Sequence, residues 1–427
     1  MPASQPAAPP RILIRLRPRV TCPHCWQGFG SEDIRWVATH PDLQNDARLG
    51  DEGLRFLPTR FNVQGNAVDS RGMICHEVAC PNCHLRVPRP LVEVPPLFAS
   101  IAGTPSCGKT YFLASMAWRL RNVLPGSFGV SFTDADPISN LPLNEYENLQ
   151  FYNPDPDAYV KLAKTQTEGD LYNLVRYGEQ IVRYPRPFLF SVRPAKEHPL
   201  FAKTSSASRL LCLYDNAGES FQPGSENAAA PVTRHLAQAQ FLMFCFDPTQ
   251  EPRLRRDCAE RSGRSETDIG LETYRQDSVF HEMVARVRQH GALHQNQKHS
   301  RPLIIVVTKF DTWSPLLGMG ERLPDPWRQK DGGLCGLDHA LIDEVSNRVR
   351  DLLRKYSPSM VSAAESFTDH VVYVPVSATG CLPVVDSDTG QSLGVSPKDI
   401  DPIWAETPML VALARWGGGL VLPADVA

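Results

Sequence analysis

Residues 103–110 read Gly-Thr-Pro-Ser-Cys-Gly-Lys-Thr, which fits the pattern G-x-x-x-x-G-K-[ST] of a phosphate-binding loop. An apolar run, residues 97–102, precedes this loop, and a helix-like run, residues 111–124, follows it. In a strand–loop–helix unit of this kind, backbone N–H groups and the positive end of the helix surround a di- or triphosphate. The stretch therefore predicts a nucleotide-binding domain with an α/β fold.

The residues of this loop have separate predicted roles. Lys109 would reach the outer phosphates, and the hydroxyl of Thr110 would ligate Mg²⁺. Gly108 leaves room for close approach of the backbone to the ligand. The residues expected to line the bound nucleotide here are Gly103, Ser106, Cys107, Gly108, Lys109 and Thr110. Cys107 lies close enough to a lysine and a helix start for a lowered pKa, although a structural thiol is the plainer interpretation.

Composition restricts the class of protein. The chain has 427 residues, of which 42% are hydrophobic and 21% charged, and this size favours two or three globular domains. A net charge of −3 argues against a globally basic nucleic-acid binder. No run approaches the ~20 apolar residues needed to cross a bilayer. Residues 1–10 lack the apolar core of a secretion signal, and residues 423–427 carry no lipidation pattern. We therefore expect a cytoplasmic protein without a membrane anchor.

Four of the 11 cysteines form two C-x₂-C pairs, Cys22 with Cys25 and Cys80 with Cys83. Two such pairs can complete a tetrahedral Cys₄ zinc site. The gap between the pairs is much longer than the ~15–20 residues of a compact zinc ribbon, so we expect an insertion at about residues 31–70. Iron accepts the same four ligands and stays an alternative. A redox C-x-x-C pair lacks the expected βαβ context and would not explain two copies.

The remaining cysteines and nearby histidines have plainer interpretations. The candidate spare ligands near the two pairs are His24, Cys75, His76 and His84, which we expect to lie beside the metal or on the surface. Cys212, Cys245 and Cys335 lie in apolar runs or loops and are expected to be buried structural thiols.

Past residue 96, strand-like and helix-like runs alternate, which predicts a mainly parallel sheet flanked by helices. The sequence thus divides into a zinc-ribbon-like module, residues 1–96, and an α/β domain, residues 97–427. The predicted strands are 97–102, 187–192, 209–214, 241–246, 303–307 and 371–376, and the predicted helices are 111–124, 271–289, 337–355 and 408–415. The charged segment 251–267 is predicted to be a solvated insertion.

Polar residues follow three of these strands. Asp215-Asn216-Ala217-Gly218 comes after one, and a carboxylate there can hold Mg²⁺ while Gly218 offers an N–H to a γ-phosphate. Thr308-Lys309-Phe310-Asp311 follows a second strand. Asp311 can accept hydrogen bonds from N1–H and the 2-amino group of guanine, and adenine offers neither donor. Ser377-Ala378-Thr379 follows the last strand, where its backbone could meet the guanine O6.

These four elements occur in chain order, and the frame from about residue 97 to 416 resembles the P-loop GTPases of the translation-factor-related class. The resemblance implies a GTP/GDP site with Mg²⁺. It assigns phosphate and Mg²⁺ binding to Lys109 and Thr110, and Mg²⁺ and γ-phosphate binding to Asp215 and Gly218. It assigns base binding to Thr308, Lys309, Asp311, Ser377 and Ala378. A zinc module ahead of one such domain also resembles the bacterial double-GTPase group, which implies a protein effector as partner.

The chain differs from this family at the residue after Gly218, next to the expected site of GTP hydrolysis. Glu219 stands where small regulatory GTPases usually have Gln, so it could polarise water as a base or slow hydrolysis by repelling the γ-phosphate. With Lys109 it is a candidate catalytic residue. Thr165 and Thr167 are candidates for the residue that senses Mg²⁺ in the long interval before Asp215. Candidates for an internal arginine finger are Arg176, Arg183 and Arg186, each of which could equally be solvated or ion-paired.

The leading hypothesis is a Mg²⁺-dependent GTP-binding switch with slow GTP hydrolysis, in which the zinc module is a docking element. One alternative is a scaffold that holds GTP without turnover, and another is a P-loop ATPase in which Asp311 has no role in choosing the base. A third makes residues 1–96 a nucleic-acid binder through Arg86, Arg89 and the arginines of residues 11–19.

Overall fold

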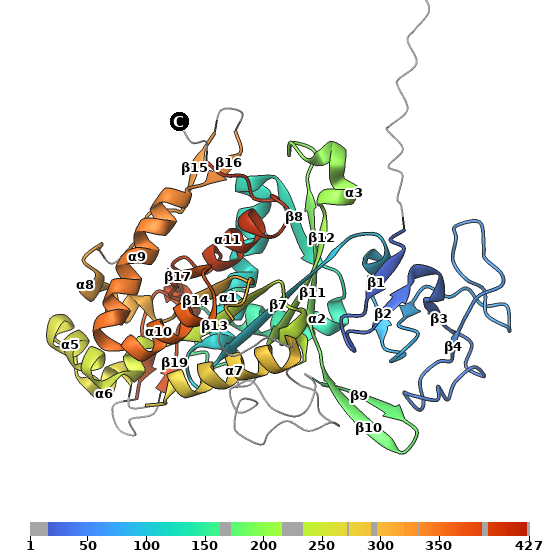
Figure 1. Ribbon diagram of the computed structural model, residues 1–427, viewed down its shortest axis with the longest axis horizontal. Helices are drawn as coiled ribbons and strands as arrows, with labels where there is room; N and C mark the ends of the chain where they lie inside the picture. The colour runs from blue at the N-terminus through green and yellow to red at the C-terminus, as the bar shows by residue number, and fades with distance from the viewer. Residues whose placement is uncertain are drawn as a thin grey trace, which may run out of the picture.

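A seven-stranded sheet forms the centre of the computed structural model, in the order β17-β14-β13-β7-β12-β11-β8 (Figure 1). The structure describes residues 16–162, 172–215, 234–270, 273–291, 297–320, 322–330, 333–386 and 392–424. The strands are β7 (Pro96–Gly103), β8 (Val130–Asp134), β11 (Phe188–Pro194), β12 (Arg209–Asp215), β13 (Phe241–Phe246), β14 (Leu303–Val307) and β17 (Val371–Pro375).

The sheet is mostly parallel, as the alternation of elements predicts. β12, β7, β13, β14 and β17 run parallel to one another, whereas β11 is antiparallel to both β12 and β8. All six predicted strands are present. β8 and the hairpin of β9 (Tyr172–Tyr177) and β10 (Gln180–Pro185) were not predicted from the sequence.

Helices flank the sheet, which confirms the predicted mixed α/β architecture. The longer ones are α1 (Lys109–Val123), α2 (Pro137–Phe151), α5 (Pro252–Ser262), α7 (Gln276–Gly291), α8 (Phe310–Leu317), α9 (His339–Tyr356), α10 (Pro358–Phe367) and α11 (Thr407–Arg415). α9 begins two residues later than predicted because Asp338 is its N-cap and accepts a hydrogen bond from the N–H of Leu341. Among the described residues no helix is both long and apolar enough to cross a bilayer.

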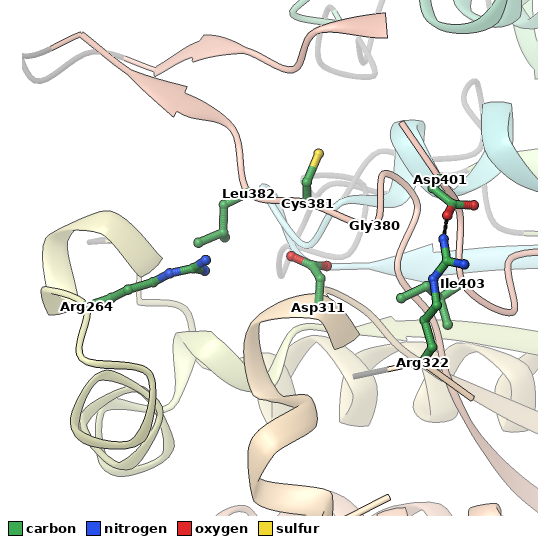
Figure 2. Close-up of a pocket in the computed structure, with 8 residues that line it drawn as sticks. All are labelled: Arg264, Asp311, Arg322, Gly380, Cys381, Leu382, Asp401 and Ile403. Atoms are coloured by element: carbon green, nitrogen blue, oxygen red, sulfur yellow. Dashed lines mark ion pairs between the residues drawn. The ribbon is translucent and has the colours of Figure 1, made fainter. Parts of the chain in front are cut away.

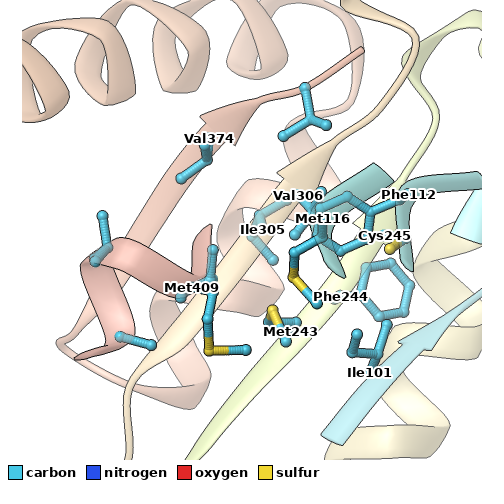
Figure 3. Close-up of a cluster of buried hydrophobic side chains, with 14 of the residues drawn as sticks. Ile101, Phe112, Met116, Met243, Phe244, Cys245, Ile305, Val306, Val374 and Met409 are labelled. Carbon is cyan, nitrogen blue, oxygen red and sulfur yellow. The ribbon is translucent and has the colours of Figure 1, made fainter. Parts of the chain in front are cut away.

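The core explains why the central strands read as unbroken apolar runs. Every residue of β13 and β14 is buried, because these strands are covered on both faces of the sheet. Figure 3 shows how side chains from neighbouring strands, such as Met243 and Ile305, meet Met116 of α1 and Met409 of α11.

Residues 16–95 form a module that packs on the sheet rather than beside it. Its small strands are β1 (Arg19–Thr21), β2 (Gly28–Gly30), β3 (Arg35–Val37), β4 (Arg55–Phe56), β5 (Val78–Ala79) and β6 (Arg86–Val87). In Figure 1 the module, in blue, lies next to β11 and β12 at the end of the molecule opposite to α9. Its buried residues share one apolar cluster with Phe98, Leu210 and Tyr214 of the sheet. The segment between the cysteine pairs supplies β3 and β4 to the same small sheet as β5 and β6, so the predicted insertion belongs to the module's own fold.

The charged segment 251–267 is solvated in its second part, residues 260–267, as its composition suggested, but not in its first part. It folds into α5 and the short α6 (Glu266–Ile269), and Leu254 and Cys258 of α5 are buried against α8 and the core. For this first part the prediction was wrong, because the few apolar residues recur on one face of a helix while charges dominate the composition.

Candidate functional site

The loop of residues 103–110 connects β7 to α1, as its sequence predicts. A side chain at Gly103 would place its Cβ 2.8 Å from the sulfur of Cys107 and 2.8 Å from the carbonyl oxygen of Cys245, so only glycine fits. Gly108 has a φ of +83° and is the N-cap of α1, a conformation that glycine adopts without strain. Gly103 is therefore required by the close packing around it, and Gly108 by its positive φ.

Lys109 and Asp215 face each other at the carboxyl ends of adjacent strands. The Lys109 Nζ lies 3.5 Å from Asp215 Oδ1, and each side chain is only 7% exposed. Burial disfavours the charged amine, but nearby negative groups, with Asp215 first among them, together raise the pKa of Lys109. Thr110 follows in the first turn of α1. A buried ammonium and a carboxylate thus pair beside the first turn of α1, which also carries Thr110.

Buried polar residues outside the predicted set brace this loop. The hydroxyl of Thr104 donates to Gln276 Oε1 at 3.3 Å, and Gln250 Nε2 donates to the carbonyl of Pro105 at 3.3 Å. Gln276 also bonds both backbone polar groups of Asp247, at 2.9 and 2.7 Å. Sequence reasoning missed these residues. The sequence did carry a signal for Asp247, because it directly follows the apolar strand β13, much as Asp215 ends β12.

Asp247 holds the second lysine of the site. Lys309 Nζ lies 2.6 Å from Asp247 Oδ2, whose side chain is fully buried. Burial alone would lower the pKa of Lys309, but this carboxylate raises it. The Thr308 hydroxyl donates to the carbonyl of Cys107 at 2.7 Å and so ties β14 to the loop. The segment 308–311 is therefore joined directly to the loop by a buried hydrogen bond.

Asp311 lies at the edge of a pocket with Ser377. The Ser377 hydroxyl donates to Asp311 Oδ1 at 2.5 Å and accepts from the N–H of Gly380 at 2.8 Å. Burial raises the pKa of Asp311, while the bond from Ser377 opposes that rise. The hydroxyl of Ser115 in α1 donates to the carbonyl of Ala378 at 2.6 Å. The last predicted element is thereby connected to the helix that begins at Lys109.

The pocket at Asp311 has a volume of about 270 Å³. Its lining residues come from five separate stretches of the chain: Arg264, Asp311, Arg322, Gly380, Cys381, Leu382, Asp401 and Ile403 (Figure 2). Arg322 forms an ion pair with Asp401 on one side, and Arg264 extends toward Asp311 from the other side. Neither arginine was predicted from the sequence, because each comes from a connection between elements.

Several predicted residues are not placed near this site. Gly218, Glu219, Thr165 and Thr167 lie outside the described residues. Arg176 of β9 lies opposite Ile181, and Arg183 of β10 lies opposite Leu174. The backbone N–H of Arg176 donates to the carbonyl of Arg48 in the N-terminal module at 2.9 Å. Arg186 donates to Asn173 Oδ1 at 3.4 Å. This placement beside the N-terminal module argues against an arginine finger from this hairpin.

The four predicted cysteine ligands converge. The sulfurs of Cys22, Cys25, Cys80 and Cys83 are all buried and lie within 4.8 Å of one another, with Cys22 to Cys83 and Cys25 to Cys80 both at 3.8 Å. Tetrahedral geometry with Zn–S bonds of ~2.3 Å separates sulfurs by about 3.8 Å. The cluster therefore has the dimensions of a Cys₄ metal site.

The two C-x₂-C turns have equivalent backbones. The N–H of His24 donates to Cys22 Sγ and that of Asn82 to Cys80 Sγ, both at 3.3 Å. The residues after the second cysteines, Trp26 and His84, both have positive φ, at +59° and +65°. Backbone N–H groups aimed at sulfur stabilise thiolates, which are the form that binds metal.

The pKa directions within the cluster show the effect of burying four thiols together. Hydrogen bonds from the other three thiols lower the pKa of Cys80, whereas burial raises that of Cys22 and Cys83. Four buried thiols can lose all four protons only if a cation compensates their charge. The donor set thus fits a soft divalent metal.

The candidate spare ligands bond elsewhere or face solvent. His24 Nε2 lies 2.9 Å from the carbonyl of Arg86, and His84 Nδ1 lies 2.9 Å from the carboxylate of Asp46. His76 is exposed, and the thiol of Cys75 points to Asp69 and Met73. Within the described part of the chain, the only group of three or more candidate ligands close enough for a metal is the four-cysteine cluster.

The cysteine cluster is connected to the strand that carries Asp215. Tyr214 is fully buried, and its hydroxyl accepts a bond from Trp26 Nε1 at 3.1 Å and donates to the carbonyl of Pro23. Its ring stacks on His235 with centroids 4.5 Å apart, and His235 Nδ1 is 2.8 Å from the hydroxyl of Ser100. One C-x₂-C turn therefore contacts the residue that directly precedes Asp215.

No protein-family model and no curated protein matches this chain. What the protein does must therefore be inferred from the chemistry of the two sites.

Proposed function

We propose that the chain binds a guanine nucleotide with Mg²⁺ and acts as a switch that hydrolyses GTP slowly. The observation that carries this proposal is the convergence of Lys109, Asp215 and Asp311 at the carboxyl edge of neighbouring, mostly parallel strands. Ligands of open α/β sheets bind outside that edge. The resemblance of the four sequence elements to P-loop GTPases supports the same assignment.

Each residue has a defined task in this proposal. Lys109 would exchange its bond with Asp215 for the outer phosphates, and the positive start of α1 would favour the same negative charge. Asp215 and Thr110 carry the oxygen donors that Mg²⁺ prefers. Mg²⁺, when bound, would neutralise phosphate charge. Asp311 would accept from the guanine N1–H and 2-amino groups, and Ser377 holds its carboxylate in place.

The residues proposed to sense and hydrolyse the γ-phosphate are Gly218 and Glu219. A carboxylate next to a γ-phosphate positions the attacking water poorly, because its negative charge repels the phosphate. We therefore propose slow turnover and a role in signalling to a protein partner.

We propose further that the four-cysteine cluster holds zinc as a structural ion and that the surrounding module is a docking element. Nucleic acid is the less favoured partner, because two of the arginines considered for that role, Arg86 and Arg89, are already engaged. Arg86 pairs with Glu77 and Glu52 at 3.1 and 3.3 Å. The Arg89 guanidinium lies 4.8 Å from the centre of the Trp36 ring. Elemental analysis of the purified protein distinguishes zinc from iron.

Titration with fluorescent GDP, GTP and ATP analogues tests the nucleotide assignment. We expect guanine nucleotides to bind in the presence of Mg²⁺, and Lys109→Ala to weaken binding at least tenfold because it removes a buried phosphate ligand. Lys196→Ala, at an exposed lysine, is the matched control and should bind as the wild type does. Preference for ATP, or equal binding by Lys109→Ala and Lys196→Ala, contradicts the proposal.

The choice of base has its own test. Asp311→Asn should weaken GTP binding and improve binding of xanthosine triphosphate, because the amide donates where the carboxylate accepts. No change in the ratio of the two affinities would show that Asp311 does not read the base. Single-turnover phosphate release then separates a slow GTPase from a scaffold on which GTP persists.

A further inference from the structure

Arg264 is the feature of the Asp311 pocket that the proposed function leaves unused. It follows Gly263, where α5 ends with a φ of +65°, a conformation that turns the chain sharply. The N–H of Arg264 still bonds the carbonyl of Ala259 at 3.2 Å, so the start of this side chain is fixed to the helix end. Its guanidinium lies at the pocket, opposite Arg322 and on the same side of the pocket as Leu382 (Figure 2).

The two arginines of the pocket differ in their ion pairs. Arg322 is paired with Asp401, whereas Arg264 forms no ion pair with any residue in the described ranges. The other carboxylate of the pocket, on Asp311, is buried and held by Ser377. Arg264 therefore places a planar cation at the pocket, and this cation forms no ion pair with a carboxylate among the described residues.

A purine held at Asp311 needs a cover for its ring faces. Asp311 can contact only the edge of the base, where N1–H and the 2-amino group lie. An arginine guanidinium is flat, weakly hydrated and stacks on aromatic faces, and an aliphatic side chain such as Leu382 covers the same kind of surface. In this pocket, Asp311 is thus suited to contact the edge of the base, and Arg264 and Leu382 are suited to cover its ring face.

We propose that Arg264 is a base-binding residue that stacks on the face of the bound purine, so that the helical segment 252–269 becomes part of the nucleotide site. This inference rests on the proposed nucleotide-binding function and names a contact that the sequence elements do not contain. Because a ring face is common to all purines, Arg264 adds affinity without selecting the base. Asp311 makes that selection.

Dissociation of fluorescent GDP from the full chain tests this role. Arg264→Ala should dissociate about tenfold faster, corresponding to about 1.4 kcal/mol, which lies within the range of cation–π contacts. Arg264→Lys keeps the positive charge but lacks the planar guanidinium. Its dissociation rate should lie between those of Arg264→Ala and the wild type. Arg256→Ala is the matched control, because Arg256 is exposed on α5. Unchanged dissociation from Arg264→Ala, or an equal change in Arg256→Ala, overturns the proposal.

A comparison of bases separates stacking from edge recognition. The ratio of GTP to ITP affinity should stay the same in Arg264→Ala, since inosine lacks only the 2-amino group at the edge, and should collapse in Asp311→Ala. A changed ratio in Arg264→Ala overturns the stacking role. If the wild type prefers ATP and Arg264→Ala weakens ATP binding, the guanine assignment fails while the stacking role stands. If the wild type binds no purine nucleotide, both fail.

Discussion

Replacing Tyr214 with phenylalanine tests whether the cysteine module and the central sheet stabilise each other. The side chain is fully buried, and its hydroxyl bonds both Trp26 Nε1 and the carbonyl of Pro23, which lies between the first two cysteines. Tyr214→Phe removes only the hydroxyl and leaves both partners without that bond.

The expected magnitude follows from these partners. A buried polar group left without a partner costs about 1–3 kcal/mol. The Pro23 carbonyl should incur this cost in full, and Trp26, which is partly exposed, should recover some of it from water. We therefore expect Tyr214→Phe to lower the free energy of unfolding of the metal-loaded protein by about 2–4 kcal/mol. Because Pro23 belongs to a ligand turn, metal affinity should also fall by about 10–100-fold.

Urea unfolding of the metal-loaded protein and chelator competition measure the two effects. Tyr373→Phe is the matched control, because the buried Tyr373 hydroxyl has no hydrogen-bond partner among the residues that the structure describes. It should be neutral or slightly stabilising. Equal losses in Tyr214→Phe and Tyr373→Phe would refute the reasoning. A loss of stability without a loss of metal affinity would show that the hydroxyl supports the sheet alone.

Three other expectations follow from buried charges. Chelation of the metal, or Cys80→Ser, should lower the melting temperature in calorimetry, and an unchanged melting temperature would exclude a structural ion. Burial raises the pKa of Glu147 to about 7 although Arg121 opposes it, so the folded state retains the proton that the unfolded state loses near 4.5. Stability should then fall by up to about 3 kcal/mol as the pH rises from about 4.5 to about 7, and Glu147→Gln should abolish that fall in urea titrations. Asp247→Asn leaves Lys309 without its carboxylate and should weaken GTP binding about tenfold or more in the same fluorescence titration, while equal affinity would exclude this role.

Much of the central sheet could be predicted because its signals are local. Strands such as β13 and β14 are buried on both faces, so their residues must all be apolar, and this is visible in a short window of sequence. The polar residues that follow these strands gather at one edge because the strands are parallel, which explains why Lys109 could be expected near Asp215. The C-x₂-C pairs are equally local.

The remaining residues of the site could not be predicted in the same way. Gln250 and Gln276 brace the loop at Thr104 from more than 140 positions further along the chain. Their side chains resemble any surface glutamine until the fold buries them. The composition of segment 251–267 pointed to solvent, yet its helical folding carries Arg264 to the Asp311 pocket.

The sequence by itself determined a mostly parallel α/β sheet and a cluster of four cysteines, because hydrophobic periodicity and ligand spacing are properties of neighbouring residues. Only the tertiary structure decided that the cysteine module packs on the sheet through Tyr214, that Asp247 pairs with Lys309, and that Arg264 reaches the pocket. Each of these contacts joins segments that are distant in the chain, and burial around them depends on how all the elements pack together.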